Sequence, residues 1–355
     1  MGSVYVTISA LDAGHITLPD YLFVAGSDPD LRTTVPSLSF LIQHPSSPPS
    51  RTGNVTNLIF DLGVKRDLSG YAPAQQPHVA QRTPIITDPD CSASLRNGVT
   101  SASEDEDADG EAEELLNPET DIDFVILSHV HWDHIGTPSD FPSATFIVGS
   151  GTLGLLKNGG GQYYPAELFN ADELPAARTV ELPPAPTPAP ITPGDDFRAY
   201  YAAAHTPAHT LIPSTTQAKL PPSAGSWSWQ PFSGFPRTID IFNDHSVYVI
   251  DSPGHIFGHI NLLLRTGARK YVFLGGDCCH DTRILDGSKD IAEYDDGKGG
   301  VRSVHTHTEL AKRTLVEIEK GLESLRADGV EVEVVLAHDR GWRDGNRQRF
   351  WPGKM

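Results

Sequence analysis

The sequence has few cysteines. It has no long apolar run, and its N-terminus does not look like a leader. Only three cysteines occur among 355 residues, Cys91 and the adjacent pair Cys278 and Cys279, so a disulfide framework is excluded and reduced thiols are expected. No stretch approaches the roughly 18 apolar residues of a membrane span, and the N-terminus has no basic segment followed by an apolar core. We therefore expect a soluble, cytoplasmic protein with no membrane partner.

Clusters of basic residues are also missing. The formal net charge is -19, and much of it comes from the run 104–114, which holds eight acidic residues and no basic one. Proteins that bind nucleic acid neutralise phosphates with clustered Lys and Arg, so a nucleic-acid partner is disfavoured. Because the run has no apolar period, we expect it to lie in a flexible acidic insertion, residues 97–118, with a functional acidic tail as the alternative.

The size of the chain suits one large domain. The hydrophobic content of 38% can bury a sizeable core, and we expect a single domain over residues 1–355. The proline-rich stretch 182–193 is predicted to cross the surface as an extended connector. A second insertion, 212–236, is rich in Pro, Ser and Trp, and its Trp227 and Trp229 either line a substrate entrance or form the loop's own small core.

Apolar runs with strand-forming composition fall into two groups along the chain. The first group covers residues 4–10, 38–42, 57–61, 123–127 and 144–148. The second group covers residues 239–242, 247–250, 260–264, 271–274 and 330–336. Helical spacing of leucine and isoleucine predicts a helix that begins at the cap Thr308 and stops at Gly329. Two groups of strands followed by helices predict an α/β fold with two packed sheets and helices outside.

Three irregular segments connect or interrupt these runs. Asp12–His15 is predicted to end the first strand, and 151–157 is predicted to form a brief helix. The stretch 66–89 is rich in Pro and Gln and gives no clear element. It either covers a site or, as we favour, is a plain surface loop.

The segment Ser128–His134 is the densest chemical feature and directly follows an apolar strand. It contains three histidines and one aspartate within six positions, namely His129, His131, Asp133 and His134. Alternate side chains of an extended segment point the same way, so His129 and His131 can bind one ion while Asp133 and His134 face a second. A histidine-rich surface loop is the alternative, but four such residues at the end of a strand favour a site for two metals.

Further candidate ligands also follow predicted strands. His255 and His259 lie in a Pro-Gly turn after one strand, Asp277 follows another, and His338 follows the last. Since strand ends at one sheet edge can converge, these side chains can join those of the first cluster. The pattern predicts a binuclear metal site.

The motifs His-x-His-x-Asp-His, Pro-Gly-His, a strand-end Asp and a late His make this sequence resemble the metallo-β-lactamase superfamily along nearly its whole length. The resemblance implies an αββα sandwich of two mixed β-sheets flanked by helices. It also implies two Zn²⁺ ions, for which Fe or Mn can substitute. By position, the resemblance implies that one ion is held by His129, His131 and His255, the other by Asp133, His134 and His338, and that Asp277 bridges them.

This ligand set predicts hydrolysis at a carbonyl. Two zinc ions lower the pKa of a shared water to roughly 7, so a metal-bridging hydroxide is the expected nucleophile and no Ser or Cys nucleophile is needed. One ion polarises the carbonyl of the substrate and stabilises the oxyanion. Asp133 or Asp277 is expected to shuttle the proton.

Within the superfamily, the sequence is most similar to the lactonase branch, which includes N-acyl homoserine lactonases. Those enzymes commonly carry a tyrosine three residues after the bridging Asp, where it aids the substrate carbonyl, and this chain has His280 there. A histidine can also donate a hydrogen bond, so His280 is a candidate catalytic residue. This departure and the long insertions indicate a fungal or other eukaryotic relative whose partner is a small lactone or lactam.

Two other functions are weighed against this one. A glyoxalase-II-like thioesterase would need basic residues in a C-terminal helical extension, whereas only 17 residues follow His338. A metal-binding protein without turnover is the alternative from a different class, and the complete ligand set argues against it. The sequence is also compatible with a homodimer of two copies of the chain.

The remaining histidines and cysteines receive structural interpretations. His259 is expected to support the site rather than bind metal. Cys278 and Cys279 are expected to be packed thiols, with a modulating role as the alternative. Solvent exposure is expected for the histidines outside the strand ends, which are His205, His209, His245, His305 and His307.

Overall fold

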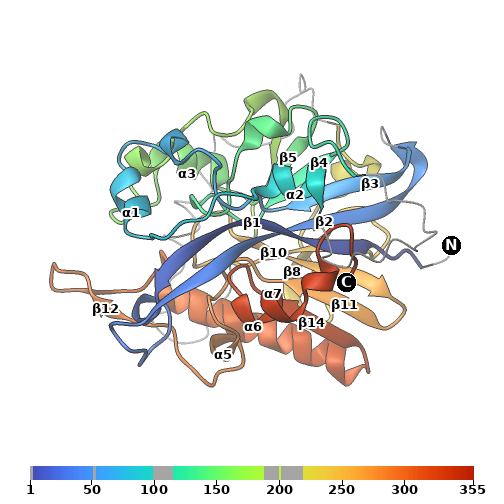
Figure 1. The fold of residues 1–355 in the computed structure, drawn as a ribbon. Helices are drawn as coiled ribbons and strands as arrows, with labels where there is room; N and C mark the ends of the chain where they lie inside the picture. The colour runs from blue at the N-terminus through green and yellow to red at the C-terminus, as the bar shows by residue number, and fades with distance from the viewer. Residues whose placement is uncertain (1–2, 51–52, 99–114, 188–199, 201–218) are drawn as a thin grey trace.

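Two six-stranded sheets packed together form the body of the protein (Figure 1). The computed structural model describes residues 3–50, 53–98, 115–187, 200 and 219–355. The first sheet has the order β1 (Thr7–Pro19), β2 (Arg32–Ser50), β3 (Gly53–Phe60), β4 (Phe124–Leu127), β5 (Thr145–Val148) and β6 (Thr179–Glu181). The second has the order β14 (Glu331–Val335), β11 (Lys270–Leu274), β10 (Ile260–Gly267), β9 (Val247–Asp251), β8 (Phe235–Asp240) and β7 (Gln230–Phe232). A small hairpin consists of β12 (Tyr294–Asp295) and β13 (Val301–Arg302).

Both sheets mix antiparallel and parallel pairs. In the first sheet β1, β2 and β3 are antiparallel neighbours, and β3 to β6 run parallel. In the second sheet β14 pairs in parallel with β11, and the other neighbours are antiparallel.

The α-helices in the described part of the chain are α1 (Gln76–Ala80), α2 (Cys91–Asn97), α3 (Thr152–Asn158), α5 (Thr282–Leu285), α6 (Thr308–Ala327) and α7 (Arg340–Gly345). The 3₁₀-helices are η1 (Asp20–Leu22), η2 (Leu68–Gly70), η3 (Pro138–Asp140), η4 (Ala166–Leu168), η5 (Ala176–Arg178), η7 (Pro222–Ser226) and η8 (Arg347–Arg349).

Alternation along the strands divides the core into two parts. In β4, Phe124 and Ile126 belong to the cluster between the sheets, together with Leu262 of β10. Val125 and Leu127 belong to the cluster on the outer faces of the sheets, which also holds the buried positions of α6. Because β4 is buried on both faces, all of its residues are apolar. The predicted α/β fold with two mixed sheets and flanking helices is confirmed.

The first strand does not end where its sequence suggests. β1 continues to Pro19, and its register with β2 shifts between Asp12 and His15. Gly14 has φ +92°, a backbone conformation that suits glycine, so the irregularity is absorbed as a bulge and pairing resumes after it. The prediction of a strand end at Asp12–His15 was therefore wrong.

The long helix is capped differently from the prediction. The N-cap of α6 is His307, whose Nδ1 accepts a hydrogen bond from the Leu310 amide at 3.2 Å, and Thr308 is already helical. The C-terminal end matches the prediction, because Gly329 has φ +71° just beyond the helix.

Parts of both predicted insertions lie outside the described residues. Of the acidic insertion 97–118, residues 99–114 are not described, and 201–218 precede the described part of the second insertion. The described part, from residue 219, contains η7 and the edge strand β7, so it is not a purely irregular loop. Among the described residues, no helix is long and apolar enough to cross a membrane.

A buried carboxylate joins the first strand to the end of the chain. Asp12 is 4% exposed, and it accepts hydrogen bonds from Arg343 Nε at 2.7 Å, Arg343 Nη2 at 2.9 Å and Arg347 Nη1 at 2.8 Å. Burial by itself would raise the pKa of Asp12, but the two arginines hold it below its ordinary value. Its negative charge therefore stabilises the folded protein.

We expect Asp12→Asn to lower the free energy of unfolding at pH 7 by about 2 kcal/mol, less than the ~3–5 kcal/mol of a fully buried pair because both arginines are partly exposed. The contribution is complete above the ordinary pKa of an aspartate and is lost as the pH falls through the depressed folded value. Urea unfolding at several pH values should therefore show that wild type and variant converge in acid. The exposed Asp344, which also contacts Arg343, gives the control Asp344→Asn with a change within about 0.5 kcal/mol, and an equal loss in both variants would contradict the prediction.

Candidate metal centre

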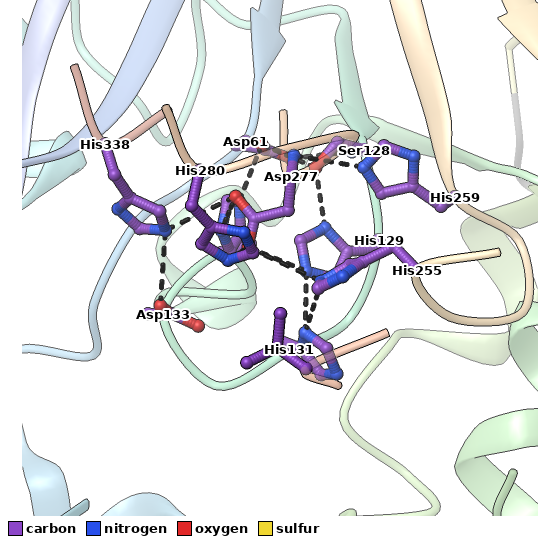
Figure 2. Close-up of polar contacts among 12 residues, drawn as sticks. Asp61, Ser128, His129, His131, Asp133, His255, His259, Asp277, His280 and His338 are labelled. Carbon is purple, nitrogen blue, oxygen red and sulfur yellow. Dashed lines mark hydrogen bonds and ion pairs between the residues drawn. The ribbon is translucent and has the colours of Figure 1, made fainter. Parts of the chain in front are cut away.

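The predicted ligands come from loops that follow four strands and meet at one edge of the sandwich. Ser128–His134 follows β4, and His255, Asp277 and His338 come after β9, β11 and β14. Figure 2 shows Asp277 between a set of imidazoles on one side and His338 with Asp133 on the other. Rigid strands therefore fix the starting point of every loop.

The first group contains three histidines whose ring nitrogens point at one another. His129 Nε2 lies 2.9 Å from His131 Nδ1, and His255 Nε2 lies 3.0 Å from that same atom. Asp277 Oδ2 lies 3.4 Å from His255 Nε2 and 3.8 Å from His129 Nε2. Three imidazole nitrogens about one point, with a carboxylate oxygen as fourth donor, suit a tetrahedral ion such as Zn²⁺.

The second group lies on the other side of Asp277. Its Oδ1 atom is 3.2 Å from His134 Nε2 and 3.3 Å from His338 Nε2, and Asp133 Oδ2 is 3.6 Å from His338 Nε2. The Nε2 atoms of both histidines and Asp277 Oδ1 are buried and make no hydrogen bond to any described residue. Buried polar atoms seldom lack a partner, so this donor set fits a second cation.

Burial and neighbouring charges set the protonation of these side chains. Burial, reinforced by the neighbouring histidines, lowers the pKa of His129, and burial brings the pKa of His131 to about 4. Burial would raise the pKa of Asp277, but His134, His280 and His338 hold it well below the ordinary value. The first group thus presents neutral imidazoles and a carboxylate, the forms that bind metal.

Asp61 orients the loop that carries the metal motif, a role that the sequence did not reveal. It follows β3 with φ +60°, which aspartate tolerates better than most residues. Its Oδ1 accepts the Ser128 amide at 2.6 Å, and its Oδ2 lies 2.7 Å from Ser128 Oγ and 2.9 Å from His134 Nδ1. With Nδ1 held by Asp61, His134 directs Nε2 toward Asp277. The signal available was an aspartate directly after an apolar strand.

Other buried contacts orient the remaining ligands. His338 Nδ1 donates to the Pro36 carbonyl at 2.7 Å. His259 Nε2 accepts the Asp277 amide at 3.1 Å, and its Nδ1 faces the Ser252 carbonyl at 3.1 Å. Burial lowers the pKa of His259 to about 3, so the ring stays neutral and can accept that amide. These contacts match the supporting position expected for His259.

The expected exposure of the other histidines holds only in part. His245 is exposed, whereas His305 is 5% exposed and its Nδ1 lies 3.1 Å from His255 Nδ1. The expectation for His305 was wrong because the segment after β13 returns to the site, a long-range contact that its local sequence does not show. His307 is half-buried as the cap of α6, and His205 and His209 lie outside the described residues.

A cavity of about 430 Å³ opens over both groups. Its floor includes His131, Asp133, Asp277 and His280, and the His280 Nε2 atom lies 3.1 Å from Asp277 Oδ2. His280, Asp277 and His338 form a third set of potential ligand atoms. His280 therefore lies close enough to contact either a substrate or an ion.

The cavity has a roof made from residues that the sequence left uncertain. Tyr71, Gln75 and Arg82 from the stretch 66–89 line it, so this stretch covers the site and the favoured interpretation as a plain surface loop was wrong. Trp227 and Trp229 do not line it. They pack against the core between the sheets, and their indoles donate to the carbonyls of Ile241 and Pro183.

The two adjacent cysteines are packed under the site. Cys278 and Cys279 are 3% and 0% exposed, and both thiols are free. A hydrogen bond with Cys278, together with burial, raises the pKa of the Cys279 thiol well above its ordinary value. An unreactive thiol agrees with the predicted packing role.

Comparison with known proteins finds a family model that matches part of the chain. The model of the metallo-beta-lactamase superfamily matches residues 100–217, the part that contains the first histidine cluster. Within this segment the chain resembles the metallo-beta-lactamase superfamily. This match confirms the resemblance expected from the sequence, and the relatives described next include proteins named as hydrolases.

Several curated relatives are fungal proteins. The chain is 29% identical over 253 residues to metallo-hydrolase mfmC of Annulohypoxylon moriforme, covering 70% of this chain and 50% of that protein. It is 27% identical over 250 residues to gamma-lactamase FDB1 of Fusarium pseudograminearum, with 69% and 45% covered. It is also 26% identical to cytochrome P450 monooxygenase mpaDE of Penicillium brevicompactum over 99% of this chain. The chain spans about a third of that relative's length, 35%.

Solved structures support the same fold. A mutant of AiiA from B. thuringiensis, with N-decanoyl-L-homoserine bound at its active site, has a TM-score of 0.58 at 14% identity, with 100% of both chains covered. A probable metal-dependent hydrolase from Staphylococcus aureus has a TM-score of 0.53 at 14% identity, covering 95% of this chain and 91% of that one. At such identities the likeness establishes the fold.

We expect Asp61→Asn to weaken metal binding about 10- to 100-fold, because an amide does not supply the charge that holds His134 Nδ1. Titration of the metal-loaded protein with a competing chelator measures the change. Asp140→Asn removes a carboxylate that pairs with Arg66 away from the ligands, so its metal affinity should equal that of the wild type. Equal affinity in Asp61→Asn would show that the loop is oriented without this charge.

Proposed function

We propose that the protein is a hydrolase with two zinc ions that opens a cyclic ester or amide, a lactone or a lactam. The observation that supports this most strongly is the sharing of Asp277, which offers Oδ2 to one group of ligands and Oδ1 to the other. The names of similar proteins, gamma-lactamase among fungal proteins and N-acyl homoserine lactone hydrolase among solved structures, support the substrate class. We further propose that residues 1–355 form one catalytic domain.

Each side chain has a defined part in this proposal. When bound, zinc ions supply a Lewis acid and lower the pKa of water. Asp277 lies between the two ligand groups and would be shared by both ions. Asp133 belongs to the second group and also lines the cavity, so its carboxylate can take a proton and return it to the leaving oxygen or nitrogen. One ion would be held by His129, His131 and His255, and the other by Asp133, His134 and His338.

His280 is proposed to donate a hydrogen bond to the carbonyl oxygen of the substrate. Its side chain is 6% exposed, lines the cavity and packs on Phe23 with the ring centroids 4.5 Å apart and the rings tilted by 45°, which restricts the imidazole. Its Nε2 atom lies above Asp277, where the reacting group would bind. A preorganised donor at this position stabilises the negative charge that develops on the oxygen.

We expect His280→Phe to lower kcat about 10²- to 10³-fold, the loss typical of one oxyanion donor, while two metals per chain remain. His280→Gln, which keeps a donor, should restore part of the rate. Metal analysis of both variants, together with kcat, distinguishes a hydrogen-bond donor to the substrate from a metal ligand. A fall in metal content on removal of the imidazole would instead assign His280 as a ligand.

The overall proposal is tested by metal analysis and a hydrolysis screen. Mass spectrometry of the purified protein should find about two zinc ions per chain, and a pH-indicator screen should detect ring opening of lactones or lactams that a chelator abolishes. His129→Ala and Asp277→Ala should remove this turnover, whereas Asp140→Asn should retain it. Bound iron or manganese would correct the metal, and preferred turnover of thioesters would favour the glyoxalase-II-like alternative. Less than one metal per chain, or turnover that survives both substitutions, would contradict the proposal.

A further inference from the structure

Two arginines from distant parts of the chain line the cavity over the metal ligands. Arg82 follows α1 in the roof, and Arg302 is the last residue of β13, where it pairs with Tyr294 of β12. Neither residue belongs to a motif that the proposed hydrolysis uses. Their shared position in one cavity therefore calls for a separate explanation.

Arg82 is a buried cation without a partner in the described part of the chain. It is 9% exposed, and its guanidinium makes no hydrogen bond or ion pair with any described residue. Burial is the main cause that lowers the pKa of Arg82. The attraction of Asp133 partly offsets this effect, but Asp133 belongs to the second ligand group, whose cation would use its charge.

Arg302 is similarly free to bind an anion. Its guanidinium lies 4.5 Å from the ring centre of Tyr163 and 5.4 Å from that of Tyr294, and cation–π contacts of this kind leave its hydrogen-bond donors available. Its Nε atom is buried and has no hydrogen-bond partner among the residues that the structure describes. The two tyrosines thus support the guanidinium without neutralising it.

Arg237 provides a comparison for the buried Arg82 in this acidic protein. With 46 acidic and 27 basic residues, carboxylates are in excess, and Arg237, the other arginine that is as deeply buried in the described chain, uses two of them. Arg237 binds Asp251 at 2.7 Å and Glu317 at 2.9 Å. Unpaired buried charges are costly, so arginines at a cavity that lack a protein carboxylate are expected to bind one from a ligand.

The rest of the cavity indicates what such a ligand looks like. Its walls include Phe23, Trp132, Tyr164 and Phe169, and the Tyr164 ring stacks on His131 with centroids 5.1 Å apart. These rings favour a flat or apolar body next to the metal ligands. No lysine lines the cavity in the described chain, so the lining offers two guanidinium groups, which suit the two oxygens of one carboxylate better than a doubly charged phosphate.

We propose that Arg82 and Arg302 bind a carboxylate on the substrate, remote from the bond that is cleaved, so that the preferred substrate is an aromatic or other apolar lactone or lactam that carries an acid group. The identity of the cleaved bond rests on the proposed function. The carboxylate site rests on the two arginines and stands without it.

Binding of a non-hydrolysable pair of probes tests the site directly. Isothermal titration calorimetry of the metal-loaded protein compares 4-phenylbutyrate with 4-phenylbutanamide, which differ in charge but hardly in size. The wild type should prefer the acid, and Arg82→Gln should reduce this preference about 10- to 100-fold, the range for a hydrogen bond to a charged group. Arg302→Gln should also reduce it, and Arg82→Lys should restore part of it.

Two controls separate this effect from general ones. Arg326→Gln makes the same charge change on the exposed face of α6, where Arg326 contacts Glu319 at 3.4 Å, and should leave the preference unchanged. Because Arg82 has no partner to lose among the described residues, Arg82→Gln should not lower the thermal unfolding temperature. A reduced preference for the acid in this variant would then not be caused by loss of folded protein.

The outcomes for the two proposals are distinct. If the preference for the acid survives in both Arg82→Gln and Arg302→Gln, the carboxylate binds elsewhere, for example at the metals, and the inference is overturned. If the preference depends on Arg82 but no lactone or lactam is hydrolysed, the carboxylate site stands and the proposed function fails. If ring opening is found, kcat/KM for 3,4-dihydrocoumarin-6-carboxylate should exceed that for its carboxamide in the wild type, and equal values would contradict the inference.

Discussion

The arrangement of the whole site depends on one buried carboxylate between two sets of nitrogen donors. Asp277 has an oxygen within 3.4 Å of His255 and another within 3.3 Å of both His134 and His338. Without positive charge between them, so many buried acceptors would repel one another, and three of these atoms have no hydrogen-bond partner in the described chain. The strands and the supporting hydrogen bonds of Asp61, His259 and His338 hold this arrangement in place.

Local patterns predicted most of the elements and the gathering of the candidate ligand residues. The apolar run 124–127 predicted β4, and the residues after four strands predicted where potential metal ligands gather. Strand ends at one edge converge for a simple geometric reason, so residues far apart along the chain, such as His129 and His338, could be grouped from their sequence context alone. Their roles as ligands remain a prediction that metal analysis must test.

Features set by long-range contacts could not be predicted in this way. Asp61 orients His134 from another strand, His305 contacts His255 from a distant loop, and Arg82 reaches the cavity from a stretch without periodicity. In each case the residue type and its neighbours in sequence fit several environments. The bulge in β1 was missed for a related reason, since a glycine that bends a strand looks like one that ends it.

The roof and the metal loops are supplied by separate stretches of chain. Residues 66–89 form much of the roof, whereas the ligands lie in loops that are anchored directly on β4, β9, β11 and β14. Changes in the roof can therefore alter the shape and charge of the cavity while the ligand positions stay fixed by the sheets. A single scaffold of this design can diversify its substrates over evolution, or in the laboratory, by exchange of one segment.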